Sequence, residues 1–371
     1  MISYTVVEDR IYSLLINSDT IVVHELSCEF PLKDEVDSLR MSIIEPFQDN
    51  ISKMSKIDEW TNIYVEKGYY LYKRLIEPML PWLKTDLIII TDDVLGYIPF
   101  ELLLTQRPLN QVAFQDYPYL LKEYNISYNY SASLLSEMLK NKSDVEVRKN
   151  SLSIAPFVSK NFHELVEKNY PEFLSATRHD TLSPLPFSIS ETASIAKITA
   201  GDVWYGETAT VDKFMIEAQK YKMLHIATHA IVDDQVADYA FLAMGDPDDP
   251  SQYDKLYVRD IYNMPLNADM VTLSACRTGY GKIQHGEGVI SLARAFAYAG
   301  SKSIITTHWN VDDKSTSELM KSFYNNLMRG TQKHEALRSA KIEFLNNHKK
   351  IKAHPFYWGG VFAIGDMSPI D

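Results

Sequence analysis

The sequence predicts an α/β protein in which helices cover both faces of a sheet. Two observations predict this fold class. From residue 190 onward, apolar runs with the length of strands alternate with segments of helical periodicity, as in a mainly parallel sheet. The segment 86–91 contains a continuous apolar run, 87–90, with charged residues on either side of it, which is typical of a strand buried on both faces.

The first 150 residues are expected to form one domain. Polar breaks separate three apolar runs near the start, which predicts an antiparallel meander. The composition becomes polar at 141–151, as in a linker, so we expect domains at 1–150 and 151–371. The predicted elements of the first domain are strands at 3–7, 11–16 and 20–25, helices at 34–48 and 60–84, strands at 86–91 and 126–130, and a short helix after residue 97.

Residues 151–371 are expected to hold the more regular part of the sheet. A strand begins at residue 152, and the prolines and serines of 170–190 predict an exposed loop. From residue 190 the predicted elements are helix 190–200, strand 202–206, helix 211–220, strands 222–228 and 239–244, helix 258–263, strand 269–275, helix 287–299, strand 303–309, helices 313–328 and 332–346, and strand 357–365.

The charge balance argues against polyanionic partners. The 371 residues include 37 lysines and arginines and 49 aspartates and glutamates, which gives a net charge of −12. No run of basic residues breaks this excess, so neither nucleic acid nor a membrane surface is an expected partner. Apolar stretches are too short to span a bilayer, and Glu8 and Asp9 fall where a signal peptide needs an apolar run. We therefore expect a cytoplasmic protein.

Only two cysteines are present, Cys28 and Cys276. This count excludes a disulfide scaffold and a cysteine-based zinc module, and it fits a reducing compartment. Cys28 has no motif around it and is expected to be structural. Cys276 follows an apolar strand and precedes a glycine-containing turn. In an α/β sheet, that is where reactive side chains gather.

His229 ends another predicted strand in the same way. An imidazole beside a thiol can take the thiol proton and return it to a leaving amine, which is the chemistry of cysteine peptidases. The two residues are 47 positions apart, close to the roughly 50 expected between the histidine and cysteine of caspases. The segment Ser-Ala-Cys-Arg-Thr-Gly around Cys276 is near the caspase signature, with one extra residue before the glycine.

His229 and Cys276 lie within a series of motifs along the chain. The motifs are Leu-His-Ile-Ala-Thr-His-Ala (224–230), Leu-Ser-Ala-Cys-Arg-Thr-Gly (273–279), Gly-Glu-Gly-Val-Ile-Ser-Leu-Ala-Arg-Ala-Phe (286–296), Trp-Asn-Val-Asp-Asp-Lys-Ser-Thr (309–316), Glu-Ala-Leu-Arg-Ser-Ala (335–340) and His-Pro-Phe-Tyr-Trp-Gly-Gly (354–360). Together they resemble the CHAT peptidases, relatives of caspases and separase in the caspase–hemoglobinase clan, and 86–104 resembles the family's Leu-Pro-Phe segment. The resemblance implies a caspase-like sheet flanked by helices, with a degenerate, non-catalytic amino-terminal half and a catalytic carboxyl-terminal half.

The resemblance implies a His–Cys dyad for peptide-bond hydrolysis. His229 would be the general base and Cys276 the nucleophile. The backbone N–H groups of Cys276 and Ala230 would form the oxyanion hole. Family members usually have glycine after the histidine, and Ala230 keeps the backbone donor there. The reaction needs neither a metal nor an organic cofactor.

A zinc motif is the alternative interpretation of His225 and His229, because they are spaced i, i+4. Position 226 is isoleucine rather than glutamate, and the segment has the pattern of a strand instead of a helix. We therefore expect no metal site, and we expect His225 to be a hydrogen-bonded core residue.

Four acidic residues are candidates for substrate contact. Glu287 follows the nucleophile loop and either caps the next helix or contacts substrate. Asp312 and Asp313 precede a predicted helix, where they either favour the helix dipole or face the substrate. The resemblance to separase implies a substrate-facing acid at Asp313, with Asp269 as a rival. An acidic pocket would favour arginine or lysine at P1 through charge-assisted contacts.

The resemblance also implies partners. Family relatives often carry tetratricopeptide repeats upstream and act when a sensor releases the active site, and the repeat signature is absent from this sequence. We expect gated cleavage of a protein substrate, with an activator or an upstream repeat region, in a setting such as bacterial defence. Processing of the loop 170–190, which contains Arg178, is a further hypothesis. Two alternatives stay open: a catalytically silent scaffold and a cysteine-dependent acyl transferase.

Overall fold

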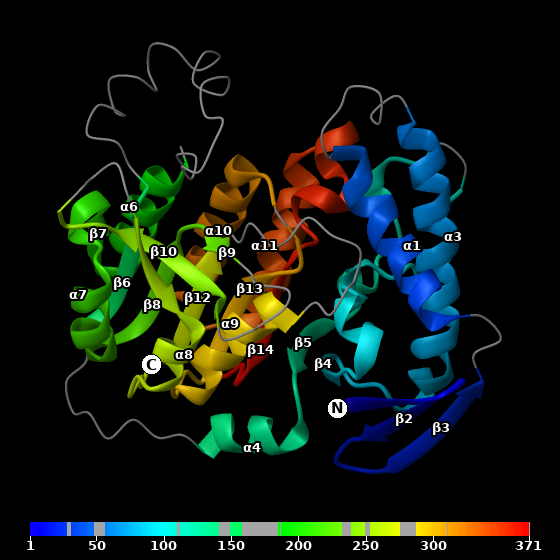
Figure 1. Cartoon of the computed structure of the whole chain (residues 1–371). Helices are drawn as coiled ribbons and strands as arrows, with labels where there is room; N and C mark the ends of the chain where they lie inside the picture. The colour runs from blue at the N-terminus through cyan, green and yellow to red at the C-terminus, as the bar shows by residue number, and fades with distance from the viewer. Residues whose placement is uncertain are drawn as a thin grey trace. The chain divides into compact units, whose positions relative to one another are not determined.

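The contacts of the computed structural model divide the chain into two units (Figure 1). The first unit consists of Met1–Glu137 and Thr331–Pro369, and the second mainly of Met138–Gly330. The division therefore differs from the predicted 1–150 and 151–371, because 331–369 return to the first unit. The residues that the structure describes are 1–27, 31–47, 56–109, 112–140, 149–157, 185, 187–231, 239–248, 253–274, 287–309 and 311–370.

The sheet of the first unit combines the predicted meander with parallel strands. Its strand order is β3-β2-β1-β4-β5-β14. The first three strands pair antiparallel, and the pairs β1–β4, β4–β5 and β5–β14 are parallel. The pairing of β14 with β5 is what brings the end of the chain back to this unit. The bounds are β1 Ile2–Val7, β2 Arg10–Ile16, β3 Ile21–Ser27, β4 Asp86–Ile90, β5 Asn125–Asn129 and β14 Val361–Gly365.

Helices α1 and α3 of the first unit pack against each other, and α11 lies on β5 and β14 (Figure 1). Helix α3 buries Leu71, Tyr72 and Leu75 at the spacing of one helical face. The helices are α1 Leu32–Ile44, α3 Ile57–Leu75, α4 Ala132–Lys140 and α11 Lys333–Asn347, with the 3₁₀ helices η1 Glu45–Phe47, η2 Glu77–Trp82, η3 Asp93–Tyr97, η4 Phe100–Leu102, η5 Phe114–Asp116, η6 Leu120–Lys122, η11 Lys350–Ala353 and η12 Pro355–Tyr357.

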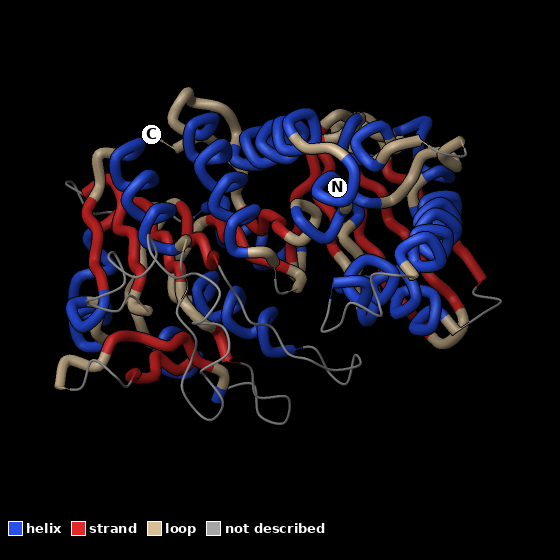
Figure 2. The backbone as a smooth tube through the Cα atoms, turned by 90° about the horizontal axis from the view of Figure 1, so that it is seen from above, coloured by secondary structure: helices blue, strands red, loops and turns tan. Residues whose placement is uncertain are grey.

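The second unit has a parallel sheet with the order β13-β12-β8-β6-β7. Every residue of β12 and β13 is buried, as continuous apolar runs predict for strands covered on both faces. Helix α6 packs on β6, β7 and β8 and against α10, and Figure 2 shows helices on both sides of the strands. The strands are β6 Lys149–Ala155, β7 Asp202–Tyr205, β8 Tyr221–Ala227, β12 Met270–Ser274 and β13 Ser303–Thr307.

A small antiparallel sheet, in the order β11-β10-β9, follows the end of β8 (Figure 1). The sequence predicted its central strand but neither of its neighbours. The remaining elements of this unit are β9 Ala230–Ile231, β10 Phe241–Gly245, β11 Tyr253–Tyr257, α6 Ser188–Thr199, α7 Val211–Glu217, α8 Val258–Tyr262, α9 Glu287–Tyr298, α10 Asp313–Leu327, and the 3₁₀ helices η8 Gly206–Thr208 and η9 Ala218–Lys220.

The predicted fold class is confirmed, because both units have sheets flanked by helices. Two of the predicted elements are shortened where prolines occur. The helix predicted over 60–84 ends as α3 at Leu75, and Pro78 and Pro81 turn the rest into η2, since proline cannot donate the hydrogen bond that an α-helix needs. The strand predicted over 357–365 begins only at Val361, after a 3₁₀ turn that starts at Pro355.

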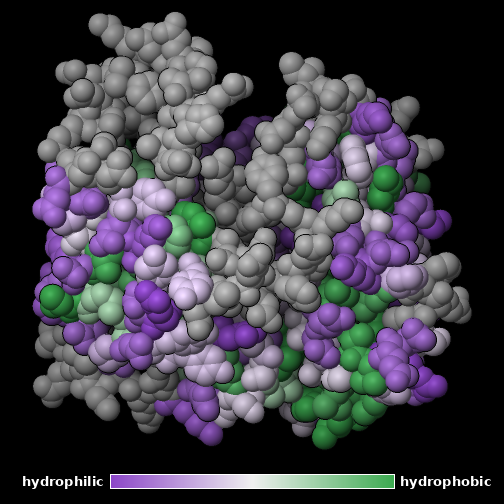
Figure 3. All heavy atoms as spheres, in the orientation of Figure 1, coloured by the Kyte–Doolittle hydropathy of each residue, from purple (hydrophilic) through white to green (hydrophobic). Residues whose placement is uncertain are grey.

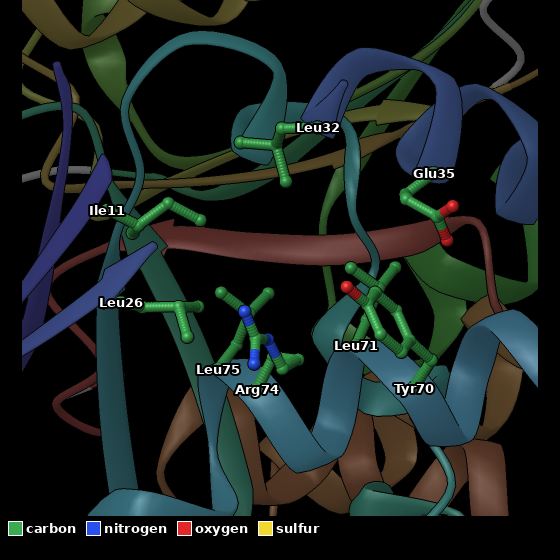
Figure 4. Close-up of a pocket in the computed structure, with 8 residues that line it drawn as sticks. All are labelled: Ile11, Leu26, Leu32, Glu35, Tyr70, Leu71, Arg74 and Leu75. Atoms are coloured by element: carbon green, nitrogen blue, oxygen red, sulfur yellow. The ribbon is translucent and has the colours of Figure 1, made fainter. Parts of the chain in front are cut away.

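The meander of the first unit has apolar side chains on both faces. Its inner face and the helices α1 and α3 line a pocket of about 20 Å³ (Figure 4). That volume holds about one water molecule, so the pocket is no site for an organic ligand. On β3, Ile21 and Val23 are 69% and 66% exposed. Figure 3 shows apolar surface over the part of the first unit where Figure 1 places β2 and β3.

Candidate active site

His229 lies just beyond the carboxyl end of β8 and is 3% exposed. Two hydrogen bonds to β10 hold the backbone around it. The Thr228 hydroxyl donates to the carbonyl oxygen of Ala243 (2.5 Å), and the N–H of Ala243 donates to the carbonyl oxygen of His229 (2.9 Å). The ring of Phe157 meets the imidazole edge to face, with centroids 4.8 Å apart. The histidine is thus fixed by its own backbone and by one aromatic neighbour.

Ala230, the predicted oxyanion-hole donor, is the first residue of β9 and is fully buried. It pairs with Leu242 of β10, and the bond from Ala243 N–H to His229 identifies this as a non-hydrogen-bonded antiparallel pair. In such a pair, the N–H of each residue points away from the partner strand. The N–H of Ala230 is therefore directed away from β10.

β12 runs beside β8 and leads toward the predicted nucleophile (Figure 1). The partners Met270 and Met223, and Ser274 and Ala227, both differ by 47 in residue number. Ser274 is the last residue of β12. Cys276 lies outside the described residues, as do Cys28 and Arg178.

An aromatic wall extends from His229 along the small sheet. We give this name to Phe157, Tyr253 and Phe241. Phe157 lies 6.2 Å from Tyr253, and Tyr253 stacks on Phe241 at 6.2 Å between ring centroids. The ammonium of Lys255 lies over the Phe241 ring, 5.0 Å from its centroid. The three rings therefore form a continuous aromatic row that begins beside the imidazole.

Asp269 does not lie near His229 along the sheet. It precedes β12, and its N–H donates to the carbonyl oxygen of Lys222 near the start of β8 (2.7 Å). Its carboxylate pairs with Lys302 at 2.7 Å. Asp269 therefore occupies the amino-terminal edge of these parallel strands, whereas His229 follows the carboxyl-terminal edge.

Asp312 caps helix α10, which agrees with its alternative interpretation as an acidic residue at the amino terminus of the helix. Its carboxylate accepts from the N–H (3.0 Å) and the hydroxyl (2.5 Å) of Ser315. Glu287 is the first residue of α9, and its side chain lies outside the described part of the chain.

Asp313 has an unusual environment for a carboxyl group. Its Oδ2 accepts from the backbone N–H of Phe187, at 2.9 Å, where α6 begins. Burial raises the pKa of Asp313 to about 6, and the nearby charges of Glu191 and Asp312 act in the same direction, whereas the bond from Phe187 opposes them. Of the three acids, Asp269 pairs with a lysine and Asp312 caps its own helix. Asp313 instead accepts a hydrogen bond from the start of another helix.

Glu191 is a buried acid that the sequence analysis missed. It lies on α6, is 1% exposed, and its Oε1 is 2.8 Å from His225 Nε2 and 2.5 Å from the Ser274 hydroxyl. Tyr324 of α10 extends the group, with its hydroxyl 3.3 Å from His225 Nδ1 and 2.9 Å from the hydroxyl of Thr272. His225 is therefore the hydrogen-bonded core residue that was expected. The buried positions of α6, which include Ile195 and Thr199 on the same face as Glu191, contain the signal that could have identified this acid.

No group of three or more histidine, cysteine, aspartate and glutamate side chains is arranged to hold a metal ion within the described ranges. In that same part of the chain, none of the helices combines the length and the apolar character that crossing a membrane requires.

Comparison with known proteins finds short matches to much longer chains. Tetratricopeptide repeat protein 28 of Homo sapiens is 28% identical over 116 residues, which is 31% of this chain and 5% of that protein. The Mus musculus protein of the same name is 26% identical over 110 residues, or 30% of this chain and 4% of that protein. The matches thus span only a small part of these relatives.

The solved structures that align with most of the chain include a separase and a gingipain. Separase in the Saccharomyces cerevisiae separase–securin complex gives a TM-score of 0.44 at 11% identity, over 94% of this chain and 21% of that chain. The Arg-specific cysteine proteinase gingipain R of Porphyromonas gingivalis gives 0.47 at 11% identity, over 91% and 74%. The family model of the CHAT domain matches residues 65–366. Because this match extends over more than half of the sequence, the chain belongs to the CHAT domain family.

Proposed function

We propose that this chain is a cysteine endopeptidase in which His229 is the general base and Cys276 the nucleophile. Membership of the CHAT domain family supports the reaction class. The observation that carries the residue assignment is the register of β8 and β12, in which every partner differs by 47. His229 and Cys276 differ by the same number.

The register supports a contact between the two residues. Neighbouring strands of a sheet lie about 4.8 Å apart, so residues level with each other on β8 and β12 are neighbours. Cys276 follows Ser274 by two residues, and its Cα is at most about 7.6 Å from that of Ser274. If the register continues for two residues, the thiol and the imidazole lie within reach of a hydrogen bond.

The proposed reaction has two stages. His229 takes the thiol proton as the sulfur attacks the scissile carbonyl carbon, and it gives this proton to the amine as the C–N bond breaks. Water, deprotonated by His229, then hydrolyses the thioester and regenerates the thiol. The N–H groups of Ala230 and Cys276 would stabilise the oxyanion in both stages. The direction of the Ala230 N–H, away from β10, supports this role.

We further propose that Asp313 selects a basic residue at P1. Of the three acids described above, Asp269 pairs with Lys302 and Asp312 caps α10. A carboxylate at Asp313 would make charge-assisted bonds with arginine or lysine. Replacement of Asp313 by asparagine should then reduce cleavage after arginine and leave cleavage after a neutral residue such as glutamine unchanged.

The first unit would be a non-catalytic, pseudo-caspase-like lobe, and a partner or a tetratricopeptide-repeat region would gate the second. The names of the two matched relatives support a repeat region. In this proposal the substrate is a protein cut at few sites, and regulated proteolysis in bacterial defence is the setting that the family suggests.

Incubation with a proteome-derived peptide library, followed by mass spectrometry of the new termini, tests the function. The wild type should produce new amino termini, and Cys276→Ala and His229→Ala should each abolish them. Cys28→Ala is the matched control and should cleave like the wild type.

The same experiment separates the alternatives. Cleavage that survives Cys276→Ala would contradict the nucleophile assignment. Peptides that become linked to amines instead of hydrolysed would identify an acyl transferase. A wild type that stays silent with these peptides, and whose Cys276 is also no more reactive than a free thiol, would favour the interaction scaffold.

A further inference from the structure

The buried group around Glu191 joins the two strands that carry the proposed dyad. We call Glu191, His225, Thr272, Ser274 and Tyr324 the Glu191 network. His225 lies on β8, and Thr272 and Ser274 lie on β12. Glu191 of α6 is hydrogen-bonded to both strands, through His225 at 2.8 Å and Ser274 at 2.5 Å.

We propose that Glu191 is a positioning residue that fixes β8 against β12 and thereby sets the contact between the His229 imidazole and the Cys276 thiol. The inference rests on the proposed function. Ser274 precedes the nucleophile by two residues, and His225 precedes the general base by four. Glu191 therefore acts through these strands and not on the substrate.

The energetics of burial support this role. A carboxylate that is 1% exposed is costly unless donors satisfy it. The two donors at Glu191 Oε1 come from different strands. Charge-assisted hydrogen bonds are short and directional, so one acceptor shared by two strands constrains their offset more narrowly than apolar packing does.

The hydrogen bonds of the network have a consistent direction. If His225 Nε2–H donates to Glu191, its Nδ1 accepts from the Tyr324 hydroxyl, and Thr272 donates to the oxygen of Tyr324. Thr272, Tyr324, His225 and Ser274 then all orient their donors, directly or through a neighbour, toward Glu191. The position of the proton on His225 is thus inferred from the distances to its hydrogen-bonding partners.

Helix α10 fixes the helix that carries Glu191. Tyr324 of α10 belongs to the network, and Asp313 at the start of α10 accepts from the N–H of Phe187 at the start of α6. The titratable groups around the Glu191 carboxylate are thus His225 from β8 and Tyr324 and Asp313 from α10. The proposed role does not require any of them to change its protonation state.

The rate of alkylation of Cys276 by iodoacetamide, measured against pH in a Cys28→Ser background, tests the proposal. A thiol paired with an imidazole reacts at lower pH than a free thiol. With Glu191→Gln, the midpoint of the profile should rise, and the rate near about pH 6.5 should fall about tenfold, as for a one-unit rise in the thiol pKa. Near about pH 9.5, where an ordinary thiol is largely ionised, the two rates should agree.

Glu101→Gln is the matched control. Glu101 is a second buried glutamate, 2% exposed and hydrogen-bonded to Tyr128 and Lys341, but it belongs to the first unit. This variant should lower the melting temperature without moving the alkylation midpoint. A midpoint that Glu191→Gln leaves unchanged, or that Glu101→Gln moves equally, would overturn the positioning role.

Two further variants keep the test decisive. Ser274→Ala removes only one bond of the network and should raise the midpoint by a smaller amount. If Glu191→Gln fails to fold, an unchanged midpoint in Ser274→Ala overturns the proposal. His229→Gln tests the proposed function separately: if it leaves the midpoint unchanged, there is no dyad and both proposals fail. If only His229→Gln raises the midpoint, the dyad stands and the role of Glu191 is rejected.

Discussion

The surroundings of Asp313 disfavour the charged form of its carboxyl group. Its pKa rises to about 6, first because the carboxyl group is buried and then because Glu191 and Asp312 lie nearby. The bond from the Phe187 N–H favours the charged form and offsets part of this effect. The carboxylate is therefore held in place by a bond that also joins α10 to α6.

The titration of Asp313 predicts how stability depends on pH. The pKa of an aspartate in the unfolded chain is 3.8, whereas the pKa of Asp313 in the folded chain is about 6. Between these pH values the folded state binds one proton more than the unfolded state. Protonation of Asp313 therefore stabilises the folded state fully below about pH 4, and this stabilisation is lost as pH rises through about 6. The loss is on the order of 1–3 kcal/mol, since one pKa unit corresponds to about 1.4 kcal/mol.

Asp313→Asn should remove this contribution, because asparagine can still accept from Phe187 but carries no charge. We expect the free energy of unfolding of the variant, relative to wild type, to increase from pH 4 to pH 7. Urea unfolding of both proteins at a series of pH values checks this, and parallel curves would contradict it.

At the scale of elements, β10 is the strand that holds the backbone of His229. It also passes very close to η8. A Cβ at Gly245 would lie 2.1 Å from the carbonyl oxygen of Gly206, and the Gly245 N–H donates to the carbonyl oxygen of Ala209 (2.9 Å). Glycine at 245 is therefore required by the close approach of two backbones.

Gly245→Ala should destabilise the protein by about 1–3 kcal/mol, the usual cost of overpacking. The strand must move away from η8, and this motion should also reduce activity because Ala243 of β10 is bonded to His229. Gly96→Ala is the control, since its Cβ would meet only the Thr91 hydroxyl, at 3.4 Å. Thermal unfolding checks both variants, and equal melting temperatures would contradict the argument.

Within the first unit, a buried ion pair joins α11 to η4. Lys341 of α11 lies 3.2 Å from Glu101 of η4, and their side chains are 1% and 3% exposed. Burial lowers the pKa of Lys341, and Glu101 opposes this. Tyr128 of β5 also donates to Glu101.

Lys341→Met should cost about 3–5 kcal/mol, because it leaves the Glu101 charge buried without its cation. Adding Glu101→Gln to this variant should recover much of the loss, since the charge is then removed as well. Melting temperatures of the single and double variants measure the recovery. A double variant that is no more stable than Lys341→Met would show that the charge is not the cause.

At the scale of the whole molecule, the sequence was sufficient for the elements whose pattern is local. The strand β4 and the meander follow from apolar runs and their periodicity. The return of α11 and β14 to the first unit could not be predicted, because strand order depends on contacts between residues far apart in the chain. The linker-like composition at 141–151 therefore indicated a boundary that the contacts place earlier, in α4.

The site was predictable to a similar extent. Motif spacing predicts His229 as the general base, which stays a prediction, and the structure places this residue just beyond the end of β8. It could not separate Asp269 from Asp313, because their partners in the fold, Lys302 for Asp269 and the Phe187 N–H for Asp313, are distant from them in the sequence. Glu191 was missed, because a glutamate on a helix is usually exposed, although it shares the buried face of α6 with Ile195 and Thr199.

The central claim is that Cys276 is a nucleophile activated by His229. Its most direct test is trapping with a peptidyl acyloxymethyl ketone mixture, followed by mass spectrometry of the labelled protein. We predict one adduct, on Cys276 and not on Cys28, which His229→Ala abolishes and Glu191→Gln weakens. An adduct on Cys28, or an adduct on Cys276 that His229→Ala leaves unchanged, would contradict the account.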